Sequence, residues 1–209
     1  MRYSRAAAVL LLFIAAAVVF PQVKPDALAE YRQGNFQRSI QICQEEISAD
    51  PGSVESYVVA CWSLLRLRRY DETLRYARTA RNLSRYDARV AEILGEVYYY
   101  QGNNNDALQY FQEYVNLAPA GQRIENVYYY IGEIYIRMGK FRHADIALST
   151  AVHWVPGNAA WWTRLAFARE NAGELTEAVI AYEQALVLNP QLPDARRGLD
   201  RARQSLANR

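Results

Sequence analysis

Residues 125–156 read ENVYYYIGEIYIRMGKFRHADIALSTAVHWVP, and this stretch decides the fold. It contains two apolar series, each with the three- and four-residue spacing of a single helix face. The first series is Val127, Ile131, Ile134 and Met138, and the second is Phe141, Ala144, Leu148, Ala151 and Val155. Gly139-Lys140 separates the two series, and Pro156-Gly157 ends the second. The stretch therefore predicts a hairpin of two short helices, which need neighbours because such helices are marginally stable alone in water.

The rest of the chain supplies these neighbours by repeating the hairpin. The segment that begins at Leu94 aligns with the one that begins at Ile131, and related segments begin at Ala60 and Leu165. Successive units are 34 residues apart, except that units three and four are 37 apart because residues 120–122 lengthen the loop between them. A period of 34 residues with two helices per unit is typical of a solenoid of stacked helical hairpins.

These repeats resemble the tetratricopeptide repeat (TPR) family, whose motif reads W-x2-L-G-x2-Y, followed by A, F and P at fixed offsets. In unit four the matching residues are Tyr128, Ile131, Gly132, Tyr135, Ala144, Leu148, Ala151 and Pro156. In unit three they are Leu94, Gly95, Tyr98, Ala107, Phe111 and Pro119. The resemblance covers roughly residues 25–190. It implies an all-α fold, a right-handed superhelical solenoid of about five TPR-like hairpins plus a C-terminal capping helix.

The repeat register also predicts the unit boundaries. They are 22–53 for a degenerate first unit, then 54–87, 88–124, 125–158 and 159–190, with the capping helix at 191–209. Unit one has Pro25 where its first helix should begin, so most of that helix is expected to be missing. Unit two has Cys61 in place of the packing glycine and Arg68 in place of the turn glycine. We therefore expect a looser turn in unit two.

The N-terminal residues 1–21 form a separate element. Arg2 and Arg5 precede 15 uncharged, mostly apolar residues from Ala6 to Phe20. As a helix this run spans about 22 Å, short of a ~30 Å hydrocarbon core, and its length fits the apolar region of an export signal. A single uncleaved membrane anchor through residues 6–20 is the alternative. Both interpretations predict an extracytoplasmic protein, either periplasmic or secreted, or anchored in the membrane with the repeats outside.

Charge and motifs exclude several classes of function. The chain has 24 basic and 22 acidic residues, and Arg2 and Arg5 account for the difference, so the repeats give no electrostatic basis for nucleic-acid binding. The only histidines, His143 and His153, have no Cys, Asp or Glu at metal-ligand spacing. No nucleophile elbow, phosphate loop or metalloprotease motif occurs. The sequence therefore predicts no enzyme, no metal and no cofactor.

The two cysteines leave two alternatives open. Cys43 lies on the second predicted helix of unit one, and Cys61 lies on the neighbouring first helix of unit two. An oxidising compartment would permit a disulfide between them. Both positions also suit a small buried residue, so two free thiols are the competing interpretation.

The TPR resemblance implies that the first helices of the units line a concave groove. The candidate partner-binding residues are Trp62, Arg66, Tyr99, Tyr100, Tyr129, Glu133, Arg137 and Phe167. Tyr, Trp and Arg are the side chains that anchor protein interfaces, although any one aromatic could instead pack between adjacent helices. In unit four we expect Tyr128 to pack and Tyr129 to contact a partner.

The sequence thus predicts a non-enzymatic scaffold for protein–protein interaction, exported or tethered to a membrane, that binds a peptide or protein in an aromatic groove. The alternative is a transport-accessory protein that holds a small hydrophobic ligand in the same groove. A third interpretation is an oligomer built through the end repeats.

Overall fold

The computed structural model describes residues 25–208, and within them the chain forms eleven α-helices and no β-strand. The helices are α1 (Ala27–Arg32), α2 (Phe36–Ala49), α3 (Val54–Arg66), α4 (Tyr70–Leu83), α5 (Ala88–Tyr100), α6 (Asn104–Leu117), α7 (Ile124–Arg137), α8 (Phe141–Trp154), α9 (Ala159–Ala172), α10 (Leu175–Leu188) and α11 (Pro193–Ala207). The predicted N-terminal segment, residues 1–21, lies outside the described residues.

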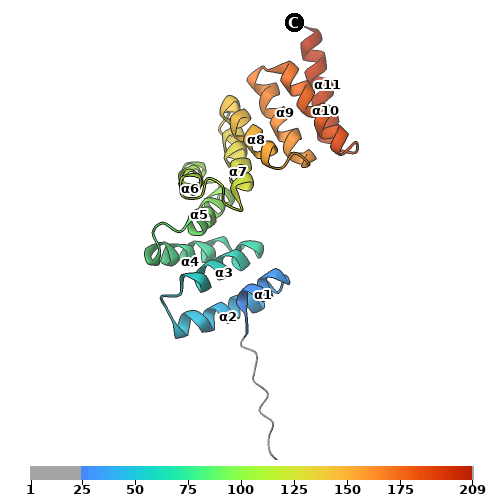
Figure 1. Ribbon diagram of the computed structural model, residues 1–209. Helices are drawn as coiled ribbons and strands as arrows, with labels where there is room; N and C mark the ends of the chain where they lie inside the picture. Colours follow the sequence, from blue (N-terminus) through green and yellow to red (C-terminus); the bar gives the residue numbers. More distant parts are fainter. Residues whose placement is uncertain (1–24, 209) are drawn as a thin grey trace, which may run out of the picture.

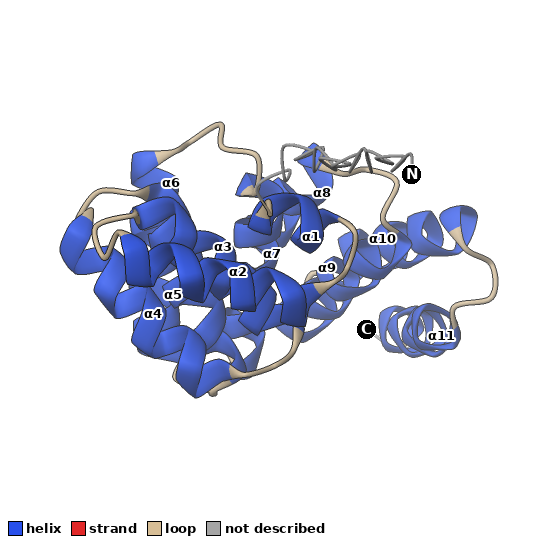
Figure 2. Cartoon of the chain, turned by 90° about the horizontal axis from the view of Figure 1, so that it is seen from below, coloured by secondary structure: helices blue, strands red, loops and turns tan. Residues whose placement is uncertain are grey.

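The helices follow one another as hairpins in a single stack, with α1 at one end and α11 at the other (Figure 1). Seen from the N-terminal end, α11 lies to one side of α1–α5, so the stack is curved rather than straight (Figure 2). This arrangement confirms the predicted all-α solenoid of TPR-like hairpins. The right hand of the superhelix stays a prediction. No helix within residues 25–208 is both long enough and apolar enough to cross a bilayer.

The ends of the stack differ from its middle. Helix α1 has only six residues and begins directly after Asp26, whose side chain accepts a hydrogen bond from the Ala29 N–H at 3.0 Å. Helix α11 begins with Pro193 and buries a narrow stripe that includes Leu199 and Ala202 against α10. Unit one is therefore truncated as expected, and α11 covers the apolar face of the last complete hairpin.

The hairpins of units three and four close where the first helix lacks a side chain. A Cβ atom on Gly95 of α5 would lie 2.6 Å from the ring of Phe111 on α6. A Cβ atom on Gly132 of α7 would lie 2.5 Å from Leu148 on α8. The two helices of these units approach closely because glycine leaves this space to the partner side chain. In unit two the larger Cys61 takes the position, and the residue opposite is Ala77 of the same buried cluster.

The turns inside the hairpins share a left-handed residue. Gly34, Gly102, Gly139 and Gly173 have φ of 84°, 78°, 69° and 88°. In unit two the same turn places Arg68 at φ 57°, and Arg68 is the only non-glycine residue of 25–208 with a positive φ. The turn therefore keeps the geometry of the other units, and the expected loosening does not occur. It keeps this geometry at the cost of a strained arginine, because the Cβ of an L-residue crowds the backbone in this region.

Replacing Arg68 with glycine is expected to stabilise the fold. Relief of the left-handed strain is worth about 1–2 kcal/mol, and the extra freedom of glycine in the unfolded chain takes back about 0.4–1 kcal/mol. The net gain should be about 0.5–1 kcal/mol in urea unfolding. The reverse exchange, Gly102→Arg in unit three, should destabilise by a similar amount. An unchanged or lower stability of R68G would show that the turn carries no strain.

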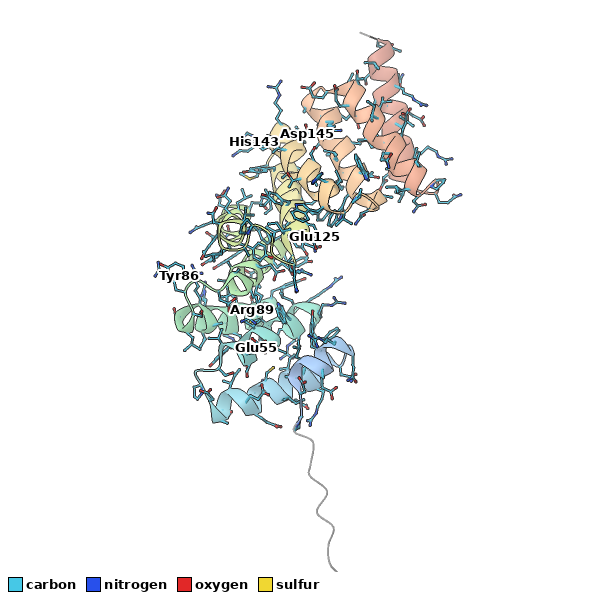
Figure 3. All side chains as sticks on the ribbon, viewed as in Figure 1. Glu55, Tyr86, Arg89, Glu125, His143 and Asp145 are labelled. Atoms are coloured by element: carbon cyan, nitrogen blue, oxygen red, sulfur yellow. The ribbon has the colours of Figure 1, made fainter. Side chains whose placement is uncertain are left out.

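Neighbouring hairpins are joined by ion pairs on the surface and by apolar packing inside. Arg89 Nη1 of α5 donates to Glu55 Oε2 of α3 at 2.5 Å, and Figure 3 labels both residues. Arg169 Nε of α9 donates to Asp145 Oδ1 of α8 at 2.8 Å. Such partly exposed pairs contribute at most about 1 kcal/mol each. The stack therefore depends mainly on its buried apolar residues.

Candidate partner-binding groove

A hollow of about 680 Å³ opens on the face formed by α1, α3, α5 and α7. Its lining residues are Tyr31, Trp62, Leu65, Arg66, Arg68, Tyr70, Glu92, Glu96, Tyr100, Gln122, Arg123, Asn126 and Tyr130. Most of them belong to the first helices of the first four units, as the TPR resemblance implied. The volume lies within the range of ligand-binding pockets in proteins.

Aromatic side chains form the walls of this hollow. The rings of Tyr31 and Trp62 have centroids 5.9 Å apart, and those of Tyr70 and Tyr100 are stacked at 5.2 Å. The hydroxyl oxygens of Tyr100 and Tyr130 are 3.1 Å apart. Tyr100 is 46% exposed, so its ring is accessible to a partner. These walls offer apolar ring faces beside hydroxyl groups that can donate or accept hydrogen bonds.

The floor of the hollow is charged. Arg123 Nε donates to Glu92 Oε1 at 2.9 Å, and Arg123 Nη2 donates to Glu96 Oε1 at 2.5 Å. Both carboxylates are buried, with Glu92 only 3% exposed, and they share this one guanidinium. Burial raises the pKa of the Glu92 carboxyl well above its usual value, and the neighbouring Glu96 raises it further. The floor therefore carries two buried carboxylates that pair with a single arginine.

Arg123 reaches this floor from the longer loop between units three and four. It directly precedes α7, and its backbone N–H donates to the Tyr114 hydroxyl at 3.1 Å. Gly121 allows the loop to lie close to α6, because it has no Cβ atom and a Cβ atom at this position would collide with the same hydroxyl. Sequence reasoning did not select Arg123. The available signal was the 37-residue spacing, which places Gln122 and Arg123 directly at the insertion.

Three of the predicted groove residues, Trp62, Arg66 and Tyr100, line this hollow together. The Arg66 guanidinium also lies 5.4 Å from the centroid of the Phe36 ring. The structure adds Tyr70 and Tyr130, which the repeat register did not select.

Two further predicted residues, Tyr99 and Arg137, contact each other and not the hollow. The Arg137 guanidinium lies 3.9 Å from the centroid of the Tyr99 ring, and Arg137 Nη1 donates to the Tyr99 carbonyl oxygen at 3.0 Å. The Tyr130 ring lies 4.8 Å from Tyr99 on another side. Tyr99 is consequently only 9% exposed and is buried, where an accessible groove aromatic was expected.

Tyr129 and Glu133 of α7 are both covered by α9. The Tyr129 ring stacks on Trp161 with centroids 5.0 Å apart, and burial raises the pKa of Tyr129 to about 12. Arg164 donates two hydrogen bonds to the buried Glu133 carboxylate, from Nε at 2.6 Å and from Nη2 at 3.0 Å. Tyr129 therefore packs between units in this structure, the alternative that the sequence left open for any single aromatic.

Phe167, the last predicted groove residue, lies in a second hollow of about 240 Å³ near the C-terminal end. The Arg164 guanidinium lies 5.2 Å from the centroid of its ring. The concave face therefore carries two hollows.

The cysteines and the potential metal ligands of residues 25–208 form no site. Cys43 and Cys61 are both buried free thiols, so the disulfide is not formed in the structure. The Cys61 thiol is instead directed at α4 of its own hairpin, where it donates to the Thr73 carbonyl oxygen at 3.7 Å. Burial raises the pKa of the Cys43 thiol to about 12. Within residues 25–208, no group of His, Cys, Asp and Glu side chains is arranged to hold a metal ion.

Comparison with known proteins agrees with this geometry. The model of a TPR family, described as the cilia and flagella-associated protein 70 C-terminal domain, matches residues 26–196. The chain belongs to this family of TPR domains. Members of helical-repeat families stack their units so that one concave surface is left for binding. No curated protein matches the chain by sequence.

Solved structures of other TPR proteins share its fold. A crystal structure of MamA has a TM-score of 0.69 at 20% identity, with 83% of this chain and 98% of that chain covered. PilW, a type IV pilus biogenesis factor, has a TM-score of 0.72 at 17% identity, with 87% and 83% covered. YrrB, a TPR protein with an unusual peptide-binding site, has a TM-score of 0.68 at 16% identity, with 82% and 87% covered. At these identities the likeness shows the fold of this TPR domain alone.

Proposed function

We propose that this TPR domain is a non-enzymatic scaffold that binds an extended segment of a protein partner in the hollow between α1, α3, α5 and α7. The observation that supports it is the gathering of five aromatic rings around a buried, charged floor in one hollow of about 680 Å³. Aromatic anchors in a partly closed pocket are the usual centre of a protein interface. YrrB, which shares the fold, has a peptide-binding site.

The lining favours a peptide over a small hydrophobic ligand. A wholly apolar ligand would cover the charged floor formed by Glu92, Glu96 and Arg123 without offering it any hydrogen-bond partner. A peptide can place an apolar side chain between Trp62 and Tyr100 and direct its amide groups at the tyrosine hydroxyls. The transport-accessory alternative therefore gains no support from this hollow.

We further propose that residues 1–21 export the protein or tether it to a membrane, with the repeats outside the cytoplasm. The support is the run of 15 uncharged residues behind two arginines in the sequence. Protease added to intact spheroplasts should degrade the repeats of the full chain. Protection of the repeats until the cells are lysed would reject this location.

Photo-crosslinking in cells tests the groove directly. A photoreactive phenylalanine analogue at position 62 or 100 of the full chain should give a discrete adduct with the partner, identified by mass spectrometry. The control position is Tyr86, which is 73% exposed in the loop between α4 and α5 and stands out from the edge of the molecule (Figure 3). Arg66→Glu should reduce the adduct from position 100 several-fold. Equal adducts from position 86, or none from positions 62 and 100, would reject the groove.

A further inference from the structure

The outer helices of the last two units expose large apolar side chains away from the groove. Ile146 on α8 is 69% exposed, and on α10 Ile180 and Val187 are 58% and 75% exposed. Trp154 and Leu188, at the ends of these two helices, are exposed as well. Neither hollow of the concave face includes a residue of α8, and the larger one includes none of α10. This outer surface is therefore separate from the proposed peptide site.

One repeat position on this surface is apolar in units four and five and polar in the others. Ile146 and Ile180 are 34 residues apart and occupy one repeat position, which faces solvent in both. In units one to three this position holds Gln41, Arg75 and Gln109, all exposed. Single exposed apolar residues are ordinary, but a repeat position that changes from polar to apolar in two adjacent units marks an interaction surface.

The charges beside these residues are complementary between the two helices. Lys140 and His143 at the start of α8 occupy the same repeat positions as Glu174 and Glu177 at the start of α10. All four residues are exposed, and none of them forms an ion pair with another residue of 25–208. Figure 3 labels His143 on the surface of α8. Lys140 therefore makes the start of α8 positive, and Glu174 and Glu177 make the start of α10 negative. An isoleucine follows one turn after His143 and one turn after Glu177.

We propose that a second copy of this chain docks on this surface, with α8 of each copy against α10 of the other. A two-fold axis parallel to these helices places each residue of unit four opposite the residue 34 positions later in the partner. Ile146 then meets Ile180 of the partner subunit, and Lys140 meets Glu174 of the partner subunit. The contact is closed and self-complementary because each copy contributes both helices.

Pairwise cysteine crosslinking of the full chain tests this register. In a background with Cys43→Ala and Cys61→Ala, the double variant Ile146→Cys with Ile180→Cys should form a covalent dimer under mild oxidation. Each single variant should crosslink at least ten-fold less, because neither residue lies opposite its own copy. Equal crosslinking of the single variants, or no dimer from the double variant, would overturn the proposal.

Charge exchange gives a second test that does not depend on thiols. Lys140→Glu should weaken self-association in analytical ultracentrifugation at least five-fold, and adding Glu174→Lys should restore it. Ile180→Glu should give a monomer, whereas Gln109→Glu at the same position of unit three should have no effect. A wild-type chain that is monomeric at all concentrations would overturn the proposal. The proposal would also be overturned if the wild type formed no dimer and Ile180→Glu instead abolished binding to a different protein or to a membrane.

Discussion

Replacing Arg123 with alanine is expected to lower the free energy of unfolding by about 2–3 kcal/mol at pH 7. The substitution leaves Glu92 and Glu96 buried without their cation, and breaking a buried ion pair from one side costs about 3–5 kcal/mol. We expect a loss below this range because the Arg123 side chain is half exposed, so water can partly replace the guanidinium. The measurement is urea unfolding of the ligand-free protein. Arg203→Ala, which removes an exposed pair with Glu183, is the matched control and should cost less than about 1 kcal/mol.

The pH dependence of this deficit identifies its cause. A carboxyl whose pKa is raised by folding binds its proton more tightly in the folded state, so its burial costs most at high pH and least once it is protonated. Loss of Arg123 removes the cation that holds the pKa of Glu92 down. The deficit of the variant should therefore be larger at pH 7 than at pH 5. A deficit of equal size at both pH values would show that Arg123 acts through packing and not through its charge.

Arg123 also illustrates what the sequence could predict about the site. Glu96 and Glu133 occupy one repeat position, and each is buried beneath an arginine from a later segment. Arg164 comes from within α9, whereas Arg123 comes from the inserted loop. The repeat register places the two glutamates on the groove face, but it cannot say which cation will reach each of them. That choice depends on the spacing between neighbouring hairpins, which the insertion changes at one place only.

The fold itself was predictable because it depends on local patterns. Apolar periodicity and the turn glycines define each hairpin, and Arg68 adopts the glycine conformation because the turn on either side demands it. The groove tyrosines were less predictable. Tyr100 is exposed and Tyr99 is buried by Arg137 and by Tyr130 of the next unit, although the two are adjacent in sequence. Contacts between units decide which of the two tyrosines is exposed, and the pattern within one unit does not predict those contacts.

Replacing Phe111 with alanine is expected to have the largest effect on stability, a loss of about 4 kcal/mol. The ring is fully buried, fills the space above Gly95 and stacks on Tyr130 with centroids 5.4 Å apart. Its removal leaves a cavity inside unit three and takes away the support of one groove wall. Unfolding by urea measures the loss, and weaker crosslinking from position 100 should accompany it.

The pairing used by unit two should recover part of this loss. Unit two combines Cys61 with Ala77 at the positions of Gly95 and Phe111, so the larger residue lies on the first helix. Gly95→Cys alone should destabilise by about 1–3 kcal/mol because the added side chain collides with the ring. Combined with Phe111→Ala, the same change should instead regain about 1 kcal/mol, because it fills the cavity. Gly95→Cys combined with Leu148→Ala in unit four is the control, and its two costs should add. Additive costs for Gly95→Cys and Phe111→Ala would show that the two positions do not share one space, and that the small residue in each hairpin is not set by the size of its partner.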